Sequence, residues 1–383
     1  MKLSRSIKLI ALASVAVLAI APSAFATDIT GAGSTAVASF MDTCKAAYQT
    51  ASGDTFSYAG GGSGQGKAAI NATPATKDLA YSDSVNATPP AGLLHIPAAV
   101  WPIAVAYNLN TKRHVQLSIK TISDIFGGKI TMWNDPAIAA DNNKPAKTPT
   151  YRLNKDGSVF KDKNGNAVIL SYKSVGAPFT FPAQRITVVY RGGTSGTTNN
   201  FTSAMAGTPA SVWNKKGNDS FSVANPFDVT TDPSHFQNAA SSAGVADLAD
   251  KTKYSITYVE ASYVASKANL ATVAVLNNAG NSVLPDVNGA SAQFEDSKLD
   301  AATGIITWNY ASMAKAAYPL TAATYALAFS KYSSAAVATA VKKQIEFTAF
   351  NCYDTAKTFP MIPISKTSAL GKAIMGLTAK IGA

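Results

Sequence analysis

The sequence has few of the side chains that build metal centres, with two cysteines and three histidines in 383 residues. His95, His114 and His235 show no ligand spacing relative to Cys44 or Cys352, so no metal site and no cofactor are expected. Charged residues make up only 14% of the chain, and no run of five or more basic residues occurs. This charge pattern argues against nucleic acid as a partner.

The sequence also lacks an apolar run long enough to cross a membrane. The longest near the start, Leu9 to Ala21, falls short of the roughly 20 residues that a spanning helix needs. It follows a basic start and precedes Ala24-Phe25-Ala26, the small-x-small pattern that signal peptidase reads. Residues 1–26 are therefore interpreted as a signal peptide cleaved after Ala26, in preference to an uncleaved anchor. No cysteine follows directly to carry a lipid, so a diffusible protein of the periplasm is expected, with extracellular secretion as the alternative.

The chain that remains after cleavage suits a folded protein of two domains. Removing 26 residues from 383 leaves 357, more than one ordinary core accommodates. Three basic residues and no acid leave with the signal, so the formal net charge falls from +11 to +8, an excess that attracts small anions. Cys44 and Cys352 form either one disulfide between the two ends of the chain or two buried thiols.

Short apolar strands alternate with helical segments, which predicts an α/β fold. Strands are expected at 28–30, 55–58, 79–81, 98–107, 186–190, 255–259 and 325–329. Helices are expected at about 36–50, 67–72, 118–126, 335–350 and 368–381. Residues 98–107 should leave the first domain, and 325–329 should return to it. The polar stretch 148–174 carries turn signals at Asp156-Gly157 and Asn164-Gly165, which predict an exposed β-hairpin inserted in the domain surface.

Three glycine-containing turns place small hydroxyl residues where a strand ends and a helix begins. They are Gly33-Ser34-Thr35, Gly62-Ser63-Gly64 and Thr194-Ser195-Gly196-Thr197. A helix start exposes unpaired N–H groups, and glycine lets the backbone approach a ligand closely. Arg191, at the end of a strand, can direct two N–H donors at an oxyanion. One such turn is an ordinary helix cap, and none has the P-loop ending, but three with an arginine indicate an anion site.

With these motifs the chain resembles the phosphate-binding proteins that supply ATP-driven bacterial phosphate importers. The segments that carry the resemblance keep the family's order and span most of the mature chain. They are Gly31–Thr35, Tyr58–Ser63, Ser82-Asp83, Ile122–Ile130 with Trp133–Asp135, Arg191–Thr197, Tyr258–Glu260 and Tyr318–Thr321. Asp28–Gly31 and Gly64–Ala69 also resemble the DING branch of the same superfamily, which binds phosphate too.

The resemblance implies the type 2 periplasmic binding-protein fold, in which two α/β lobes are joined by crossing strands and the ligand binds in the cleft. Lobe 1 is expected at 27–107 and 319–383, and lobe 2 at 108–318 with 148–174 as the hairpin insertion. A monomer that binds inorganic phosphate, with arsenate as an analogue, and delivers it to an inner-membrane ABC permease is implied. The alternatives are a phosphatase on the same scaffold, for which no catalytic residues are found, and a secreted DING-like protein with a surface role.

The same resemblance assigns the ligand contacts residue by residue. The expected set combines hydroxyl and N–H donors from both lobes with one arginine and one acceptor: Thr35, Ala36 (through its backbone N–H), Ser63, Asp83, Arg191, Ser195, Gly196 and Thr197. Phosphate near neutral pH still carries a proton that it can donate to Asp83. Sulfate has none, so it would leave a buried carboxylate unpaired, which predicts selectivity for phosphate. The family's acid two residues after the arginine is replaced by Gly193, so either another acid steadies Arg191 or the arginine is held less firmly.

Overall fold

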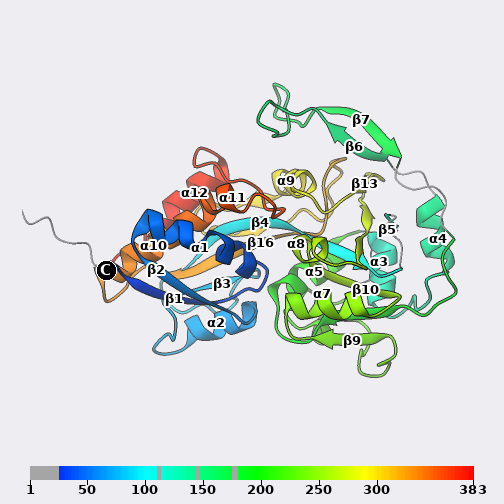
Figure 1. Cartoon of the computed structure of the whole chain (residues 1–383), viewed down its shortest axis with the longest axis horizontal. Helices are drawn as coiled ribbons and strands as arrows, with labels where there is room; N and C mark the ends of the chain where they lie inside the picture. Colours follow the sequence, from blue (N-terminus) through cyan, green and yellow to red (C-terminus); the bar gives the residue numbers. More distant parts are fainter. Residues whose placement is uncertain (1–25, 110–113, 144–146, 175–179, 210, 212) are drawn as a thin grey trace, which may run out of the picture.

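The structure is a computed structural model that describes residues 26–383, apart from residues 110–113, 144–146, 175–179, 210 and 212. The described chain forms two α/β masses that lie side by side and share one large sheet (Figure 1). We call the mass on the left of Figure 1 lobe 1 and the mass on the right lobe 2. The predicted signal segment lies outside the described residues, except for Ala26.

The large sheet has nine strands and runs through both lobes in the order β2-β1-β3-β16-β4-β10-β8-β9, with β11 added against β4. In lobe 1 the strands are β1 (Asp28–Gly33), β2 (Thr55–Gly60), β3 (Leu79–Ser82) and β16 (Thr321–Phe329). In lobe 2 they are β8 (Thr187–Arg191), β9 (Phe236–Ala239), β10 (Ser255–Glu260) and β11 (Ala271–Thr272). The parallel pairs β1–β2, β1–β3, β10–β8 and β8–β9 give each lobe a βαβ character.

Strand β4 (Leu93–Tyr107) connects the two lobes through its 15 residues. Residues Leu93–Pro102, apart from Ala98 at a register shift, pair with β16, and the last part from Ile103 pairs with β10. From His95 onward every residue is buried, which explains why the sequence reads as a continuous apolar run without alternation. The strand predicted at 98–107 is therefore confirmed and begins five residues earlier.

Helices cover both faces of the lobe 1 sheet. The helices on one face are α1 (Ala38–Ser52), α10 (Ala335–Phe350), α11 (Cys352–Thr355) and α12 (Ala369–Thr378), and α2 (Ser63–Asn71) lies on the other (Figure 1). Cys44 of α1 and Cys352 of α11 form a disulfide, with their Cα atoms 5.3 Å apart. This settles the alternative left open by the sequence. The first helix of the mature chain is thus covalently joined to its last third.

Helix α2 begins at Ser63, whereas the sequence predicted a helix only from residue 67. Glycine is a poor helix former, so Gly64 and Gly66 hid the first turn. Packing explains their presence: a Cβ at Gly66 would lie 2.7 Å from the Cα of Gly33 in β1. The absence of side chains lets this helix pack directly on the strand, which brings Ser63 to the end of β1.

The segment between β4 and β16 carries further helices and two small sheets. Its helices are α3 (Ile119–Phe126), α4 (Pro136–Asn143), α5 (Gly196–Gly207), α6 (Phe221–Ala224), α7 (Ser242–Lys251), α8 (Ala261–Ala265) and α9 (Val287–Glu295). The small sheets are formed by β5 (Gln116–Ser118), β12 (Ala274–Leu276) and β13 (Ser282–Val283), and by β14 (Lys298–Leu299) and β15 (Ile306–Thr307). Ser118, Ser195, Ser241 and Asp286 cap their helices by accepting a backbone N–H.

The predicted hairpin insertion is present as two antiparallel strands, β6 (Lys147–Tyr151) and β7 (Ile169–Ser174). Gly157 and Gly165 both have φ of +84°, which is the conformation that the turn signals required. The hairpin projects from the top of lobe 2 in Figure 1. Within the part of the chain that the structure describes, no helix has both the length and the apolar character needed to span a bilayer.

Candidate anion-binding site

The first donor turn lies where β1 ends against β3. Gly33 has φ of +133°, and a Cβ there would lie 2.0 Å from the carbonyl oxygen of Tyr81, so only glycine fits. The chain then turns into α1 with Ser34 and Thr35 buried. The hydroxyl of Ser34 accepts the backbone N–H of Ala36 at 3.1 Å and donates to Asp83 at 2.7 Å. The turn is therefore bonded to the carboxylate that the sequence singled out.

Asp83 follows the end of β3 and is 3% exposed. Three hydroxyl groups donate to its carboxylate: Ser34 at 2.7 Å, Ser63 at 3.2 Å and Thr324 at 2.7 Å. Burial raises the pKa of Asp83 from 3.8 to about 7, although these donors oppose the shift. The carboxyl can therefore exchange a proton near neutral pH. Thr324 belongs to β16, at a point where the register with β4 shifts, and no pattern in the sequence indicated its contact with Asp83.

The second lobe contributes the turn between β8 and α5. Ser195 caps α5 by accepting the N–H of Thr198 at 3.4 Å, so the start of the helix is fixed. Gly196 lies against lobe 1: a Cβ at this position would be 2.7 Å from the Ser63 hydroxyl and 2.7 Å from the Cβ of Asp83. The start of α5 thus meets the donor turns of lobe 1 without a side chain between them.

Arg191 ends β8 and is 4% exposed. Its Nη1 donates to the Thr35 hydroxyl of the other lobe at 3.1 Å, and its Nε donates to the carbonyl of Ala240 at 2.6 Å. Gly62 leaves room for the guanidinium, because a Cβ there would lie 2.8 Å from Nη2. Among the described residues, no carboxylate forms an ion pair with this arginine. The backbone carbonyl of Ala240 therefore holds the guanidinium where the family acid is replaced by Gly193.

A second buried carboxylate, Glu260, stands beside this arginine and was not predicted as a site residue. It ends β10, is 2% exposed and accepts the hydroxyl of Thr197 at 2.5 Å. Burial raises the pKa of Glu260, although the Thr197 donor and the Arg191 charge oppose the shift. The sequence offered one signal that went unused: an acid that ends an otherwise uncharged strand, which the structure shows to be buried throughout.

The two lobes also meet through a polar cluster next to the donor turns, which we call the Asp219 cluster. Lys67 of α2 reaches Asp219 at 2.5 Å and the hydroxyl of Ser84 at 2.9 Å. The carboxylate of Asp219 also accepts Ser84 at 2.8 Å and Asn199 of α5 at 3.0 Å. Its backbone carbonyl accepts the N–H of Ser195 at 2.9 Å. Asp219 of lobe 2 therefore joins Ser195 of its own lobe to Lys67 and Ser84, which lie in lobe 1 near Ser63 and Asp83.

All eight residues predicted to contact the ligand lie in one buried network at the junction of the lobes. Thr35, Ala36, Ser63 and Asp83 come from lobe 1, and Arg191, Ser195, Gly196 and Thr197 come from lobe 2. The Ser242 hydroxyl, 2.8 Å from that of Thr35, and the Tyr263 hydroxyl, which donates to the Thr35 carbonyl at 2.9 Å, add further links between the lobes. The network contains one cation, two carboxylates and many neutral donors.

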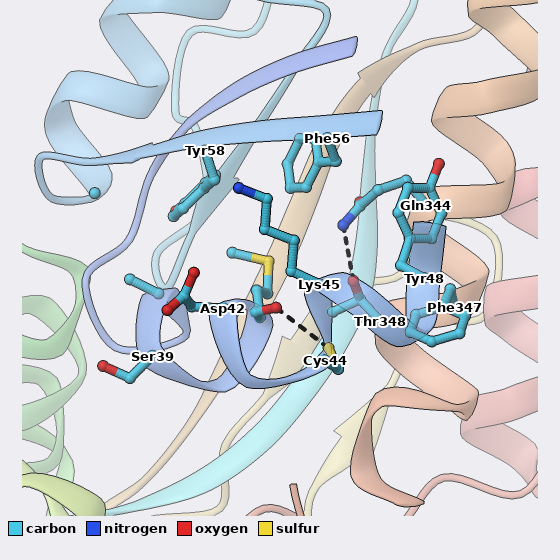
Figure 2. A pocket seen from close by; sticks show the side chains of 13 residues that line it. Ser39, Asp42, Cys44, Lys45, Tyr48, Phe56, Tyr58, Gln344, Phe347 and Thr348 are labelled. Carbon is cyan, nitrogen blue, oxygen red and sulfur yellow. Dashed lines mark hydrogen bonds between the residues drawn. The ribbon is translucent and has the colours of Figure 1, made fainter. Parts of the chain in front are cut away.

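A separate cavity of about 300 Å³ lies inside lobe 1 between α1, β2 and α10. Tyr48, Phe56, Tyr58 and Phe347 line it, and Lys45 and Asp42 lie on its α1 side (Figure 2). The hydroxyl of Tyr58 donates to the Ser34 carbonyl at 2.8 Å, so this cavity lies behind the first donor turn. None of the predicted ligand contacts lines it.

The histidines take no part in the site. His95 accepts the N–H of Asn86, and His235 bonds to the carbonyls of Ile186 and Ile125. No group of three metal-ligating side chains occurs in the described ranges of the chain. The chemistry of the network is therefore that of hydrogen-bond donors around one arginine, which suits an oxyanion.

Comparison with known proteins places this arrangement among binding proteins. A family model described as a PBP superfamily domain matches residues 20–351. The phosphate-binding protein PstS 3 of Mycobacterium tuberculosis is 30% identical over 334 residues, which cover 82% of this chain and 77% of that protein.

Solved structures also match, among them the following two. A DING protein has a TM-score of 0.61 at 20% identity and covers 93% of this chain and 100% of its own. A putative phosphate ABC transporter substrate-binding protein from Clostridium perfringens, with bound phosphate, has a TM-score of 0.54 at 16% identity and covers 88% and 100%. These likenesses establish a shared fold, and the α/β type 2 periplasmic binding-protein fold with two lobes is confirmed.

Proposed function

The chain belongs to the PstS-type phosphate-binding proteins of the PBP superfamily, and from this membership we propose that it captures inorganic phosphate for an ABC-type importer. The observation that supports the proposal most directly is the buried network in which Arg191 and the donor turns of both lobes surround Asp83. Neutral donors with a single arginine hold an oxyanion without a matching excess of positive charge.

We propose that phosphate takes over hydrogen bonds that the hydroxyls now make with one another. Arg191 Nη1 and Thr35 Oγ1, which are 3.1 Å apart, would both direct their hydrogen bonds to the anion. The N–H groups at the start of α5 and of the first turn would complete the shell. Asp83 would accept the proton that phosphate still carries, and this contact would distinguish phosphate from sulfate.

Titration calorimetry of the pure protein with phosphate and with sulfate tests the proposal. We expect tight phosphate binding and little response to sulfate. Asp83→Asn should narrow the difference in affinity between phosphate and sulfate, because an amide no longer requires a proton from the ligand. Equal binding of both anions by the wild-type protein, or an unchanged difference in the variant, would remove Asp83 from the mechanism of selection. Arsenate should compete with phosphate, because its shape and protonation are similar.

The proposed role needs an exported, monomeric protein whose lobes move relative to each other. We place lobe 1 at 27–107 and 319–383 and lobe 2 at 108–318; the crossing of β4 and the return of β16 support these boundaries, whereas Gly304 and Ile306 contact lobe 1. Cleavage after Ala26, location in the periplasm and delivery to an inner-membrane permease belong to the same proposal. N-terminal sequencing of the exported protein would test cleavage after Ala26, and a precursor that stays uncleaved would contradict it. Cell fractionation would test location in the periplasm.

Binding without turnover is part of the proposal, since the relatives' names describe binding proteins. The hydroxyls of Ser34, Ser63 and Thr197 donate to carboxylates, that of Ser195 caps α5, and the histidines named above bond elsewhere. Release of product from a chromogenic phosphomonoester, lost in a site variant such as Arg191→Ala, would instead favour a phosphatase.

A further inference from the structure

Glu260 is a buried carboxylate at the site that the capture of phosphate, as described above, does not use. One oxygen, Oε1, accepts the Thr197 hydroxyl at 2.5 Å. The other, Oε2, is buried and makes no hydrogen bond of good geometry among the described residues, although the Ser242 hydroxyl lies near enough to the carboxylate to oppose the rise of its pKa. A buried charged oxygen without a donor costs free energy, so its presence at a ligand site calls for a reason.

Thr197 has a single proton on its hydroxyl, and it cannot donate that proton in two directions. In the structure the proton points to Glu260. Thr197 Oγ1 would then present only lone pairs to an arriving oxyanion, and lone pairs repel it. If Glu260 is protonated, its own O–H can donate to Thr197 Oγ1, and the Thr197 proton becomes free for the anion.

The charges around Glu260 favour the protonated form once an anion binds. The groups that face it from neighbouring elements are the Arg191 guanidinium, the Asp83 carboxyl and the Tyr263 hydroxyl. With both carboxyls ionised, one arginine would face two buried negative charges and the charge of phosphate. Such an excess is costly in a buried site, and one added proton relieves it.

We propose that Glu260 sets the direction of the Thr197 hydroxyl and thereby makes phosphate capture depend on the uptake of one proton. Glu260 is then a positioning residue, which acts on the ligand through Thr197. The inference rests on the proposed function, because it requires phosphate to be the ligand. The proton comes from solvent, stays on Glu260 in the complex and returns to solvent when phosphate leaves.

Calorimetry in buffers of different ionisation enthalpy counts the protons taken up with each phosphate. Between pH 5 and pH 9, the wild-type uptake should exceed that of Glu260→Gln, with a maximum difference approaching one proton. An amide side chain keeps the size and can donate to Thr197, but it does not titrate. Equal uptake by the two proteins overturns the role of Glu260 and leaves phosphate capture standing. Failure of the wild-type protein to bind phosphate overturns both.

Affinity measurements separate the hydroxyl relay from simple charge repulsion. At pH 9, Glu260→Gln should bind phosphate roughly 10-fold more tightly than wild type, the value of one hydrogen bond to a charged group, and about equally at pH 5. In the Thr197→Val background the same change should have a smaller effect, because only the charge repulsion remains, whereas Thr197→Ser should preserve the full effect. A full effect without the hydroxyl would mean that Glu260 acts by charge alone and would refute the relay. Thr197→Val by itself should reduce the extra proton uptake to the part that charge repulsion causes, which tests the link without altering Glu260.

Discussion

The Asp219 cluster predicts that an ion pair outside the donor turns controls the release of phosphate. Lys67 and Asp219 belong to different lobes, and their side chains are 18% and 14% exposed. Replacing Lys67 with methionine keeps most of the aliphatic chain but removes the charge. Asp219 would then retain Ser84 and Asn199 as donors. The substitution removes an ion pair that exists only when the two lobes are in contact, so it should weaken that state alone.

The size of the effect follows from the burial of the pair. Exposed ion pairs contribute about 0–1 kcal/mol, and breaking a fully buried one costs about 3–5 kcal/mol. This pair lies between the two extremes, so we expect a loss of about 2 kcal/mol, which corresponds to a roughly 30-fold weaker Kd. In the proposed mechanism the lobes part before phosphate leaves, so the change should fall mainly on the dissociation rate.

Calorimetry for Kd and stopped-flow fluorescence for the dissociation rate would measure the loss. Asp219→Asn and the double variant complete a cycle, in which we expect a coupling energy of about 1–2 kcal/mol. Lys343→Met is the matched control, because its ion pair with Asp54 lies within lobe 1 at 3.1 Å. It should leave Kd unchanged. A Lys67→Met protein that binds and releases phosphate as wild type does would refute the reasoning, as would an equal loss in the control.

Three further predictions concern packing, protonation and the covalent link. Gly196→Ala should abolish tight phosphate binding, because its Cβ would meet Asp83 and hold the lobes apart, whereas Gly193→Ala has open space and should bind normally; calorimetry on both variants decides this. The folded protein holds a proton on Asp83 up to about pH 7, while the unfolded chain releases it above about pH 4. The unfolding free energy of the ligand-free protein should therefore fall as pH rises through this window, by roughly 4 kcal/mol at most relative to Asp83→Asn. Urea unfolding at several pH values measures this, and the same pH dependence in wild type and variant would contradict it. Reduction of the Cys44–Cys352 disulfide, which closes a loop of 308 positions, should lower that free energy by roughly 5 kcal/mol, and an unchanged urea midpoint would count against it.

The local patterns of the sequence predicted the elements well because apolar periodicity and turn residues act over short distances. The helix predicted at 335–350 has those limits in the structure, and the paired turns of the hairpin insertion are where Gly157 and Gly165 require them. The start of α2 was missed because helix propensity disfavours Gly64 and Gly66, and only the tertiary contact with Gly33 explains them.

The partners of the site residues were the part that sequence reasoning could not reach. Arg191 is held by the Ala240 carbonyl, and a backbone carbonyl leaves no trace in the side-chain pattern. Lys67 and Asp219 are 152 positions apart, and nothing in their spacing connects them. Glu260 was seen only as a landmark of the resemblance, since the contact that gives it meaning, with Thr197, forms between β10 and the start of α5.

The position of β16 has a consequence for how the newly made chain reaches this fold. β16 lies between β3 and β4, although it is the last strand in the sequence. Until residues 321–329 have been synthesised, β3 and β4 each present an edge without its neighbour, and such edges pair readily with other chains. Lobe 2 is encoded before that point and can fold as synthesis proceeds, whereas lobe 1 must wait for its final strand. A chain that stops short of β16 would therefore be prone to aggregation, and lobe 1 depends on the delivery of the entire polypeptide.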